Sequence, residues 1–231
     1  MADVGRPARR PYRSSRREGQ ARRTRRRVIE AATAAFLERG WGGATVRAVA
    51  AAAGVSVPTV EALFGTKARL LKAAIDVAIA GDDEPVPVLD RPWATAARQA
   101  RDAREFLVAV GEVVAAAQQR SAGLVLAVFE GAARDPDLAD LAEQMTAQRA
   151  GTARWIVTGL VRLAPLRPGT SRAEAVDTVW LLMEPALFDR VVRRRSWTPR
   201  RYARWFAHSA LRLLTPDDAT TATAPTSKGD S

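Results

Sequence analysis

The sequence of 231 residues contains no cysteine, one histidine and two tyrosines. Without cysteine, the chain cannot form a disulfide, a thiolate zinc site or a cysteine nucleophile, which fits the reducing cytoplasm where we expect the protein. The single histidine, His208, argues against a Ser-His-Asp triad or a multi-histidine metal site. We therefore expect neither an enzyme nor a protein that binds a metal or another cofactor.

Long hydrophobic runs are also missing from the sequence. A membrane-spanning helix needs about 18 or more consecutive apolar residues, and no segment reaches that length without charges. The N-terminus lacks the apolar stretch of a secretory signal. We expect no membrane partner. Alanine, leucine and valine dominate the composition, which favours helices over strands and predicts an all-α fold of one or two domains.

The positive charge is concentrated at the N-terminus. The chain carries a net charge of +11, and residues 1–27 hold eleven arginines against Asp3 and Glu18. Residues 1–21 have no apolar periodicity and predict a disordered Arg-rich arm, while the Thr-, Ala- and Pro-rich residues 215–231 predict a disordered tail. The arm either contacts DNA phosphates or the minor groove, which we favour, or is a solvated tail.

Residues 45–64 have the pattern of two short helices joined by a tight turn. The first begins at Thr45, whose hydroxyl can accept from a first-turn amide, and ends at Gly54, which tolerates a left-handed backbone. The second begins at Ser56, with Pro58 in its first turn, where a missing amide hydrogen costs nothing. This helix-turn-helix geometry places a second helix in a DNA major groove, although an ordinary helical hairpin has the same spacing.

A wider set of residues resembles the DNA-binding domain of TetR-type transcriptional regulators. The resemblance covers residues 22–81, about a quarter of the chain. It is carried by Val28, Ile29, Ala32, Phe36, Gly40 and Trp41, by Thr45, Val46, Arg47, Val49, Ala50, Ala53, Gly54, Val55 and Ser56, and by Thr59, Val60, Phe64, Lys67, Leu70 and Leu71. At the place of Glu61 the family commonly has an aromatic residue. A carboxylate there repels phosphate, unless it receives an amine of a DNA base, pairs with a neighbouring arginine, which we favour, or reflects a different docking.

The candidate DNA contacts lie at helix starts. The N-terminal residues of the second helix meet base edges in such motifs, so Val57 and Pro58 offer apolar contact and Thr59 can donate to phosphate or base. Arg47 suits phosphate, and the resemblance implies a further phosphate contact at Lys67. Plain capping or solvation is the alternative for each. The predicted DNA-binding residues are Thr45, Arg47, Ser56, Val57, Pro58, Thr59, Val60 and Lys67.

The predicted helices divide into two domains. A helix over 24–39 precedes the motif, and together they predict a three-helix helix-turn-helix domain; a fourth helix over 66–81 follows, all within residues 22–82. The prolines of residues 82–92 mark a boundary. Residues 93–214 predict a larger C-terminal helical bundle, to which the resemblance assigns ligand binding and dimerisation. Its long helix over 94–119 is expected either to continue through Gly111 or to break near it.

Pro185 falls inside a helix expected over residues 171–195 and predicts a kink or break there. Large apolar side chains near the kink either border a ligand cavity, with Glu184 as polar anchor, or follow a dimer interface. The candidate pocket residues are Phe106, Phe129, Trp155, Trp180, Met183 and Glu184.

The resemblance implies a homodimer formed by the helices near 172–195 and 198–214, with double-stranded DNA and an unknown small-molecule effector as further partners. It implies a repressor that leaves a palindromic operator when the effector binds. The competing function is a general basic nucleic-acid-binding protein whose Arg-rich arm carries the affinity. A helical interaction module that has lost DNA binding is a third alternative, suggested only by Glu61.

Overall fold

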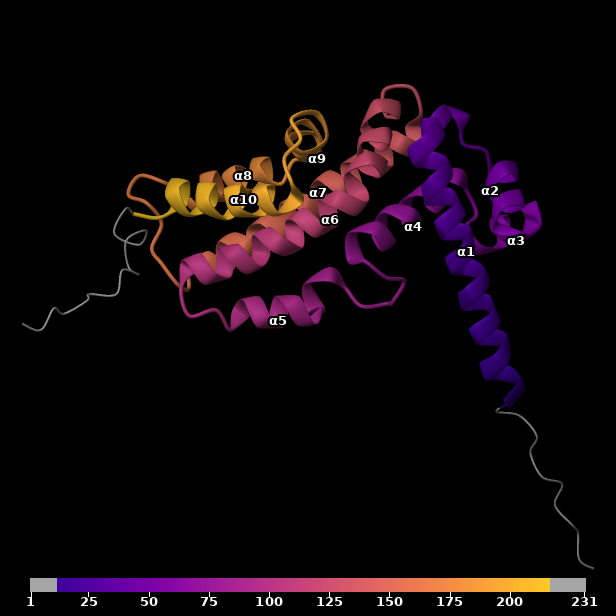
Figure 1. Cartoon of the computed structure of the whole chain (residues 1–231), viewed down its shortest axis with the longest axis horizontal. Helices are drawn as coiled ribbons and strands as arrows, with labels where there is room; N and C mark the ends of the chain where they lie inside the picture. Colours follow the sequence, from indigo (N-terminus) through magenta and orange to yellow (C-terminus); the bar gives the residue numbers. More distant parts are fainter. Residues whose placement is uncertain (1–11, 217–231) are drawn as a thin grey trace, which may run out of the picture. The chain divides into compact units, whose positions relative to one another are not determined.

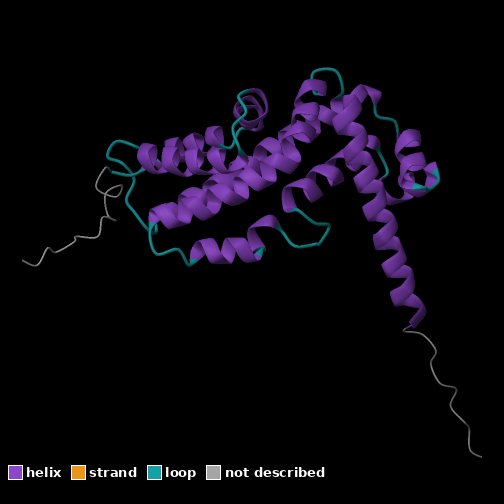
Figure 2. Cartoon of the chain, in the orientation of Figure 1, coloured by secondary structure: helices purple, strands orange, loops and turns teal. Residues whose placement is uncertain are grey.

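The computed structural model describes residues 12–216. Over this range the chain forms helices joined by loops and contains no strand (Figures 1 and 2), which confirms the predicted all-α class. The chain divides into two compact units between Ala74 and Ile75. Each unit is built around its own packed helices.

The first unit contains the predicted helix-turn-helix. Its elements are α1 (Tyr12–Gly43), α2 (Val46–Ala53), α3 (Val57–Phe64) and the first half of α4 (Lys67–Ala80). Gly40, with φ of 64°, bends the end of α1 before the chain enters α2. The inner stripe of α1 is buried against α2 and its neighbours, as its apolar spacing predicts. Its members are Val28, Ile29, Ala32 and Phe36.

The Arg-rich arm differs from its prediction. Because α1 begins at Tyr12, the expectation of disorder over residues 1–21 is wrong for residues 12–21, and residues 1–11 lie outside the described part of the chain. Arginine, glutamine, glutamate and alanine all favour a helix, and they dominate this segment. A hydrogen bond of 2.8 Å from Arg23 to Gln20, one turn apart, further supports the helix.

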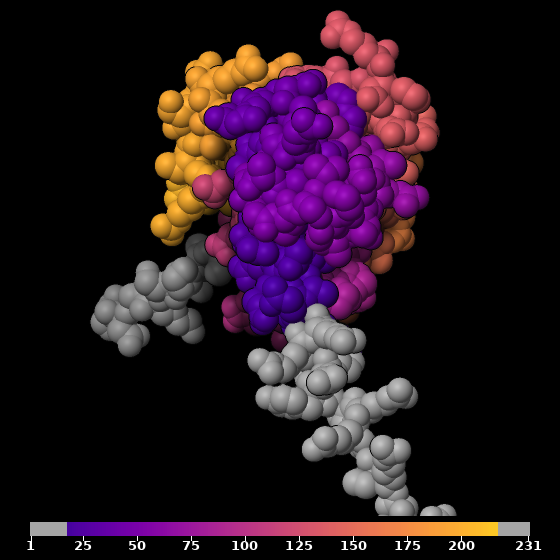
Figure 3. Space-filling model, turned by 90° about the vertical axis from the view of Figure 1, so that its right-hand side faces the viewer, coloured from indigo at the N-terminus to yellow at the C-terminus, as the bar shows by residue number. Residues whose placement is uncertain are grey.

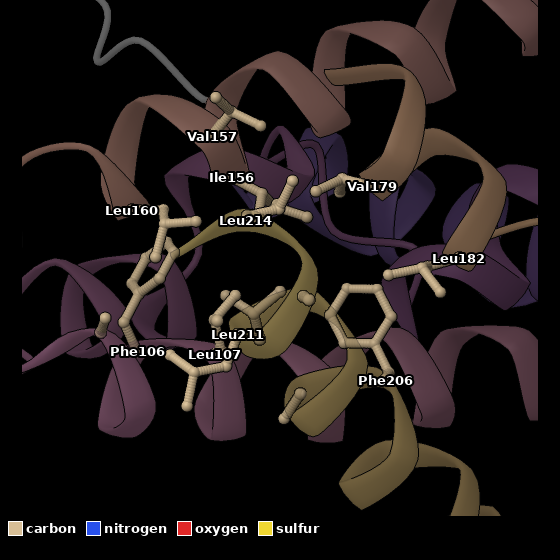
Figure 4. Packing of buried hydrophobic residues seen from close by; sticks show 14 of the residues in the cluster. Phe106, Leu107, Ile156, Val157, Leu160, Val179, Leu182, Phe206, Leu211 and Leu214 are labelled. Carbon is tan, nitrogen blue, oxygen red and sulfur yellow. The ribbon is translucent and has the colours of Figure 1, made fainter. Parts of the chain in front are cut away.

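The second unit is a bundle of longer helices. Its elements are the end of α4, the short η1 (Val88–Asp90), α5 (Pro92–Arg98), α6 (Ala103–Gly131), α7 (Pro136–Leu160), α8 (Arg172–Leu182), α9 (Pro185–Phe188), the π-helical η2 (Asp189–Arg194) and α10 (Pro199–Leu214). In Figure 1, α10 lies along α6 and beside α8. Side chains from α6, α7, α8 and α10 interlock in the core shown in Figure 4, among them Phe106, Leu160, Val179, Phe206 and Leu211.

The boundary between the units lies earlier than the proline-rich segment 82–92 suggests. The end of α4 belongs to the second unit, because Arg120 of α6 donates to the carbonyls of Ala78 and Ile79 at 2.7 and 3.0 Å. The prolines mark a loop within that unit instead. Residue Thr215, placed by the sequence in a disordered tail, is buried and caps the end of α10 by donating to the Leu211 carbonyl; residues 217–231 are not described.

Two expected helix interruptions have different outcomes. The break expected at Pro185 is confirmed, since α8 ends at Leu182 and α9 begins at the proline. The alternative of a break near Gly111 is wrong, because α6 runs through it without interruption; the helix expected over 94–119 is instead interrupted earlier, at residues 99–102 between α5 and α6. A Cβ atom at Gly111 would stand 2.7 Å from the Ala203 carbonyl oxygen, so this glycine allows α6 and α10 to approach closely.

Candidate DNA-binding interface and ligand cavity

The helix-turn-helix has the geometry that its sequence predicts. The chain bends by 105° between α2 and α3, within the range of DNA-binding motifs of this kind. Gly54 adopts the left-handed conformation, with φ of 64° and ψ of 41°, and its amide donates to carbonyls at the end of α2. No single helix in the described range could cross a membrane by length and apolarity. Only α2 and α3 counted together meet those two criteria, and they are short, sharply bent helices.

The start of α3 is held by two side chains. The Ser56 hydroxyl accepts from the Thr59 amide at 3.3 Å, which caps the helix, and the two hydroxyl oxygens lie 2.8 Å apart in a second hydrogen bond. Val57 is half-buried and Pro58 is exposed beside them. Val60, which the sequence placed among the DNA contacts, is 2 % exposed and belongs to the core instead. Four residues at this end, 56–59, therefore carry the candidate contact surface.

The preceding helix presents two further candidates. Thr45 caps α2 by accepting from the Ala48 amide at 3.1 Å, and Arg47 is exposed in the first turn. Lys67 is more constrained than its predicted role suggests. Its ammonium donates to the Trp41 carbonyl and lies 4.1 Å from the centre of the Trp41 ring, so it is anchored at the base of α4.

Glu61 does not behave as we expected. The side chain is exposed on α3, and no ion pair joins it to an arginine among residues 12–216, so the favoured pairing is wrong. Arg25 approaches α3 but contacts Phe64 and not Glu61, since its guanidinium lies 4.8 Å from the centre of the Phe64 ring. Figure 3 shows the surface of this unit, in indigo and purple, as a continuous face. Because Glu61 is exposed on α3 two residues after Thr59, its carboxylate lies near the candidate DNA contacts.

The second unit contains a cavity of about 620 Å³, within the usual size range of small-molecule sites. Its walls come from the end of α4, the segment before α5, the middle of α6 and α7, and the residues around Pro185. Most lining side chains are apolar, including Val110, Val114, Val125, Phe129, Ile156 and Met183. Such a surface stabilises an apolar guest by removing it from water.

Carboxylates line the part of the cavity nearest the loop after α4. They are Asp76, Asp82, Asp83 and Glu84, and all four are exposed. Arg91 donates to both carboxylate oxygens of Asp82, at 2.6 and 2.9 Å, and these hydrogen bonds hold the pKa of the Asp82 carboxyl below its ordinary value. The bidentate pair fixes the loop that covers this side of the cavity.

The six candidate pocket residues separate into three pairs. Phe129 and Met183 line the large cavity. Phe106 and Trp155 line a separate space of about 110 Å³ and pack against each other at 5.9 Å between ring centres, so they belong to the core. Trp180 and Glu184 both contact Arg149, a residue of the cavity wall.

Arg149 is the polar group that the sequence did not reveal. Its Nη2 lies 2.6 Å from Oε2 of Glu184, its guanidinium carbon lies 4.0 Å from the centre of the Trp180 ring, and its side chain is 14 % exposed. Gln118, also buried in the wall, donates to the Met183 carbonyl at 2.6 Å. One arginine in a long amphipathic helix such as α7 looks like a solvated charge, and only packing shows that it points inward.

The bent pair of short helices, in which the second has a capped start, follows the arginine-rich helix α1. This is the arrangement of a helix-turn-helix DNA-binding unit. Residues 28–74 match the family described as bacterial regulatory proteins, tetR family. The DNA-binding unit of the chain is therefore similar to that of the tetR family, as the sequence resemblance indicated. No curated protein matches the chain.

Solved structures of known regulators share the fold over most of the chain. NalD of Pseudomonas aeruginosa, the secondary repressor of the MexAB-OprM multidrug efflux pump, is 19 % identical with a TM-score of 0.60, over 85 % of this chain and 99 % of its own. FadR of Bacillus subtilis, in complex with stearoyl-CoA, is 14 % identical with a TM-score of 0.62, over 81 % and 97 %. A protein of Saccharomonospora viridis in complex with choline is 17 % identical with a TM-score of 0.60, over 83 % and 97 %. At these identities the likeness shows the fold.

Proposed function

We propose that the protein is a dimeric cytoplasmic repressor that binds a palindromic operator and leaves it when a small molecule occupies the cavity of the second unit. One observation carries the link between ligand and DNA. Asp76, Val77, Ile79 and Ala80 of α4 line the cavity, while the same helix begins at Lys67 in the DNA-binding unit. A guest that displaces the end of α4 therefore acts on a helix that both units share.

The structural neighbours support this proposal. NalD is a repressor, and the FadR and Saccharomonospora viridis structures hold stearoyl-CoA and choline. These ligands differ widely in charge and size. They support the existence of an effector for this chain, whereas the chemistry of that effector depends on the cavity of this chain.

The dimer contact that we propose uses α8 and α10. Leu181 of α8 and Leu213 of α10 are 58 % and 53 % exposed, more than any other large apolar side chain among the described residues. The outer face of α10 also carries Arg204 and His208, whereas that of α8 carries Asp177. In a two-fold dimer the same faces meet in both copies, so α8 of one protomer opposite α10 of its partner would bury leucines and bring opposite charges together.

Fluorescence anisotropy tests the proposal directly. Purified full-length protein is titrated against the intergenic DNA beside its own gene and against a shuffled duplex, at near-physiological salt. We expect a preference of about a thousandfold or more for the natural site, as specific regulators show. Equal and steeply salt-dependent binding to both duplexes would instead favour the general basic nucleic-acid binder.

A further inference from the structure

The cavity wall points to the chemistry of its guest. We infer that the cavity binds an uncharged, largely apolar molecule that carries a hydrogen-bond-accepting oxygen, such as a ketone or ester carbonyl, and that Arg149 is its polar anchor. The inference rests on the proposed effector function and specifies the class of effector.

Most polar groups of the inner cavity wall already donate hydrogen bonds within the protein. The Ser121 hydroxyl donates to the Ala117 carbonyl at 2.8 Å, and the Thr152 hydroxyl donates to the Gln148 carbonyl at 3.2 Å. The Gln118 amide donates to Met183. The donors of these groups are therefore engaged within the protein, and the ligand finds few donors apart from Arg149.

The Arg149 guanidinium has more donors than the protein supplies with acceptors. A guanidinium carries five N–H groups, whereas the contacts of Arg149 are one carboxylate oxygen of Glu184 and the face of Trp180. Its Nε is enclosed without a hydrogen-bond partner and is not open to the cavity. The side chain is 14 % exposed, so the N–H groups of Nη1 and Nη2 that Glu184 leaves unused are the donors that a ligand oxygen in the cavity can reach.

The charges around this anchor exclude an ionic guest. Glu184 already neutralises Arg149, so a ligand carboxylate would meet the Glu184 carboxylate and a ligand ammonium would meet the guanidinium. The carboxylates at the other side, such as Asp83 and Glu84, are exposed, so water screens both their repulsion of an anion and their attraction for a cation. They therefore do little to offset the unfavourable contact of either ion with the Arg149–Glu184 pair. An uncharged oxygen meets none of these penalties.

Calorimetric titration of the full-length protein with three probes of equal chain length tests this inference: 2-decanone, decanoate and decylammonium. We expect 2-decanone to bind at least about tenfold more tightly than either ion. Tighter or equal binding of an ion would overturn the inference, and so would the absence of binding by all three probes.

Two substitutions assign the preference to Arg149 and Glu184. Arg149→Lys keeps the charge opposite Glu184 but loses the planar array of donors, so it should weaken 2-decanone binding about tenfold. Arg154→Lys, on the exposed side of the same helix, should leave it unchanged. Glu184→Gln removes the neutralising charge, and because no cap hydrogen bond of α9 depends on this side chain, the fold should persist while the preference shifts toward decanoate. Unchanged selectivity in both cavity variants would overturn the assignment.

The DNA assay separates this inference from the proposed function. A decanoate-selective protein that leaves its operator when decanoate binds is still an effector-released repressor, with a different class of effector. A protein that binds 2-decanone but shows no operator preference would support the cavity chemistry and contradict the repressor. Each result therefore bears on one statement only.

Discussion

At the scale of single residues, several cations of this chain are held by aromatic rings. Arg25 lies over Phe64, Lys67 over Trp41, and Arg149 over Trp180. Stacking on a ring leaves the edge of a planar guanidinium available for hydrogen bonds, which lysine cannot match. The aromatic residues thus orient cations in both the DNA-binding unit and the cavity wall.

Glu61 gives the sharpest prediction at this scale. The carboxylate is exposed beside the candidate DNA contacts and has no neutralising partner among residues 12–216, so it opposes the approach of phosphate. Glu61→Gln should strengthen DNA binding several-fold at low salt, with the gain shrinking as salt screens the repulsion. Anisotropy titrations at two salt concentrations measure this. Glu143→Gln, an exposed site in the second unit, is the control. Weaker binding by Glu61→Gln would show that Glu61 contacts a base.

At the scale of helices, the close crossing of α6 and α10 depends on Gly111. A methyl group there would collide with the Ala203 carbonyl, so Gly111→Ala should lower the free energy of unfolding by about 1–3 kcal/mol. Gly151 in α7 is the matched control, because a methyl group there would lie 4.0 Å from its nearest neighbour, the end of the Arg154 side chain. Gly151→Ala should be neutral or slightly stabilising. Urea denaturation compares the two variants. Equal stability would mean that α10 shifts to accept the methyl group.

The capping box of α8 predicts a pH effect. The Ser171 amide donates to the Glu174 carboxylate at 2.7 Å, and this hydrogen bond, with that of the Ser171 side chain, lowers the pKa of Glu174. A lowered folded pKa means that the stabilisation is present above the ordinary value of 4.5 and is lost as the pH falls through the folded value. Glu174→Gln should therefore destabilise the protein at pH 7 and have less effect near pH 3. The difference between the urea midpoints of the variant and the parent protein measures this destabilisation, and it should be larger at pH 7 than near pH 3.

Helix boundaries followed from the sequence where a cap or proline marks them, and not where packing decides. Ser56 and Pro58 predicted the start of α3, and the structure places it there. The continuity of α6 through Gly111 could not be predicted, because the reason for that glycine lies on α10, far along the chain. Similarly, Ser56 and Thr59 of the DNA-binding motif were predictable from local spacing. Arg149 was not, because its burial depends on side chains from other helices.

At the scale of the whole molecule, positive charge is concentrated at the N-terminus. Residues 1–21 contain six arginines against two carboxylates, and the described part of this segment continues α1 as helix. Deleting residues 1–21 should reduce affinity for any duplex and flatten the dependence of log K on log salt, by about 0.9 for each phosphate contact removed.

The same deletion separates the two candidate functions. A repressor that reads bases through α3 keeps its preference for the natural site over a shuffled duplex. A general basic binder loses nearly all binding, and that outcome would contradict the repressor. Circular dichroism of the shortened protein checks that the remaining helices persist.

The stacking of Arg149 on Trp180 gives the protein a built-in optical reporter. The emission of an indole depends on the charge and polarity of its immediate surroundings, and here a guanidinium 4.0 Å from the ring centre sets them. Trp93 is also part of the cavity wall, in edge contact with Trp155. Any molecule that enters and displaces Arg149 should therefore change the intrinsic fluorescence. Intrinsic tryptophan fluorescence could therefore reveal effectors in crude chemical libraries without a label or DNA. Because the sequence contains no cysteine, a single cysteine introduced for a dye would be the only one present.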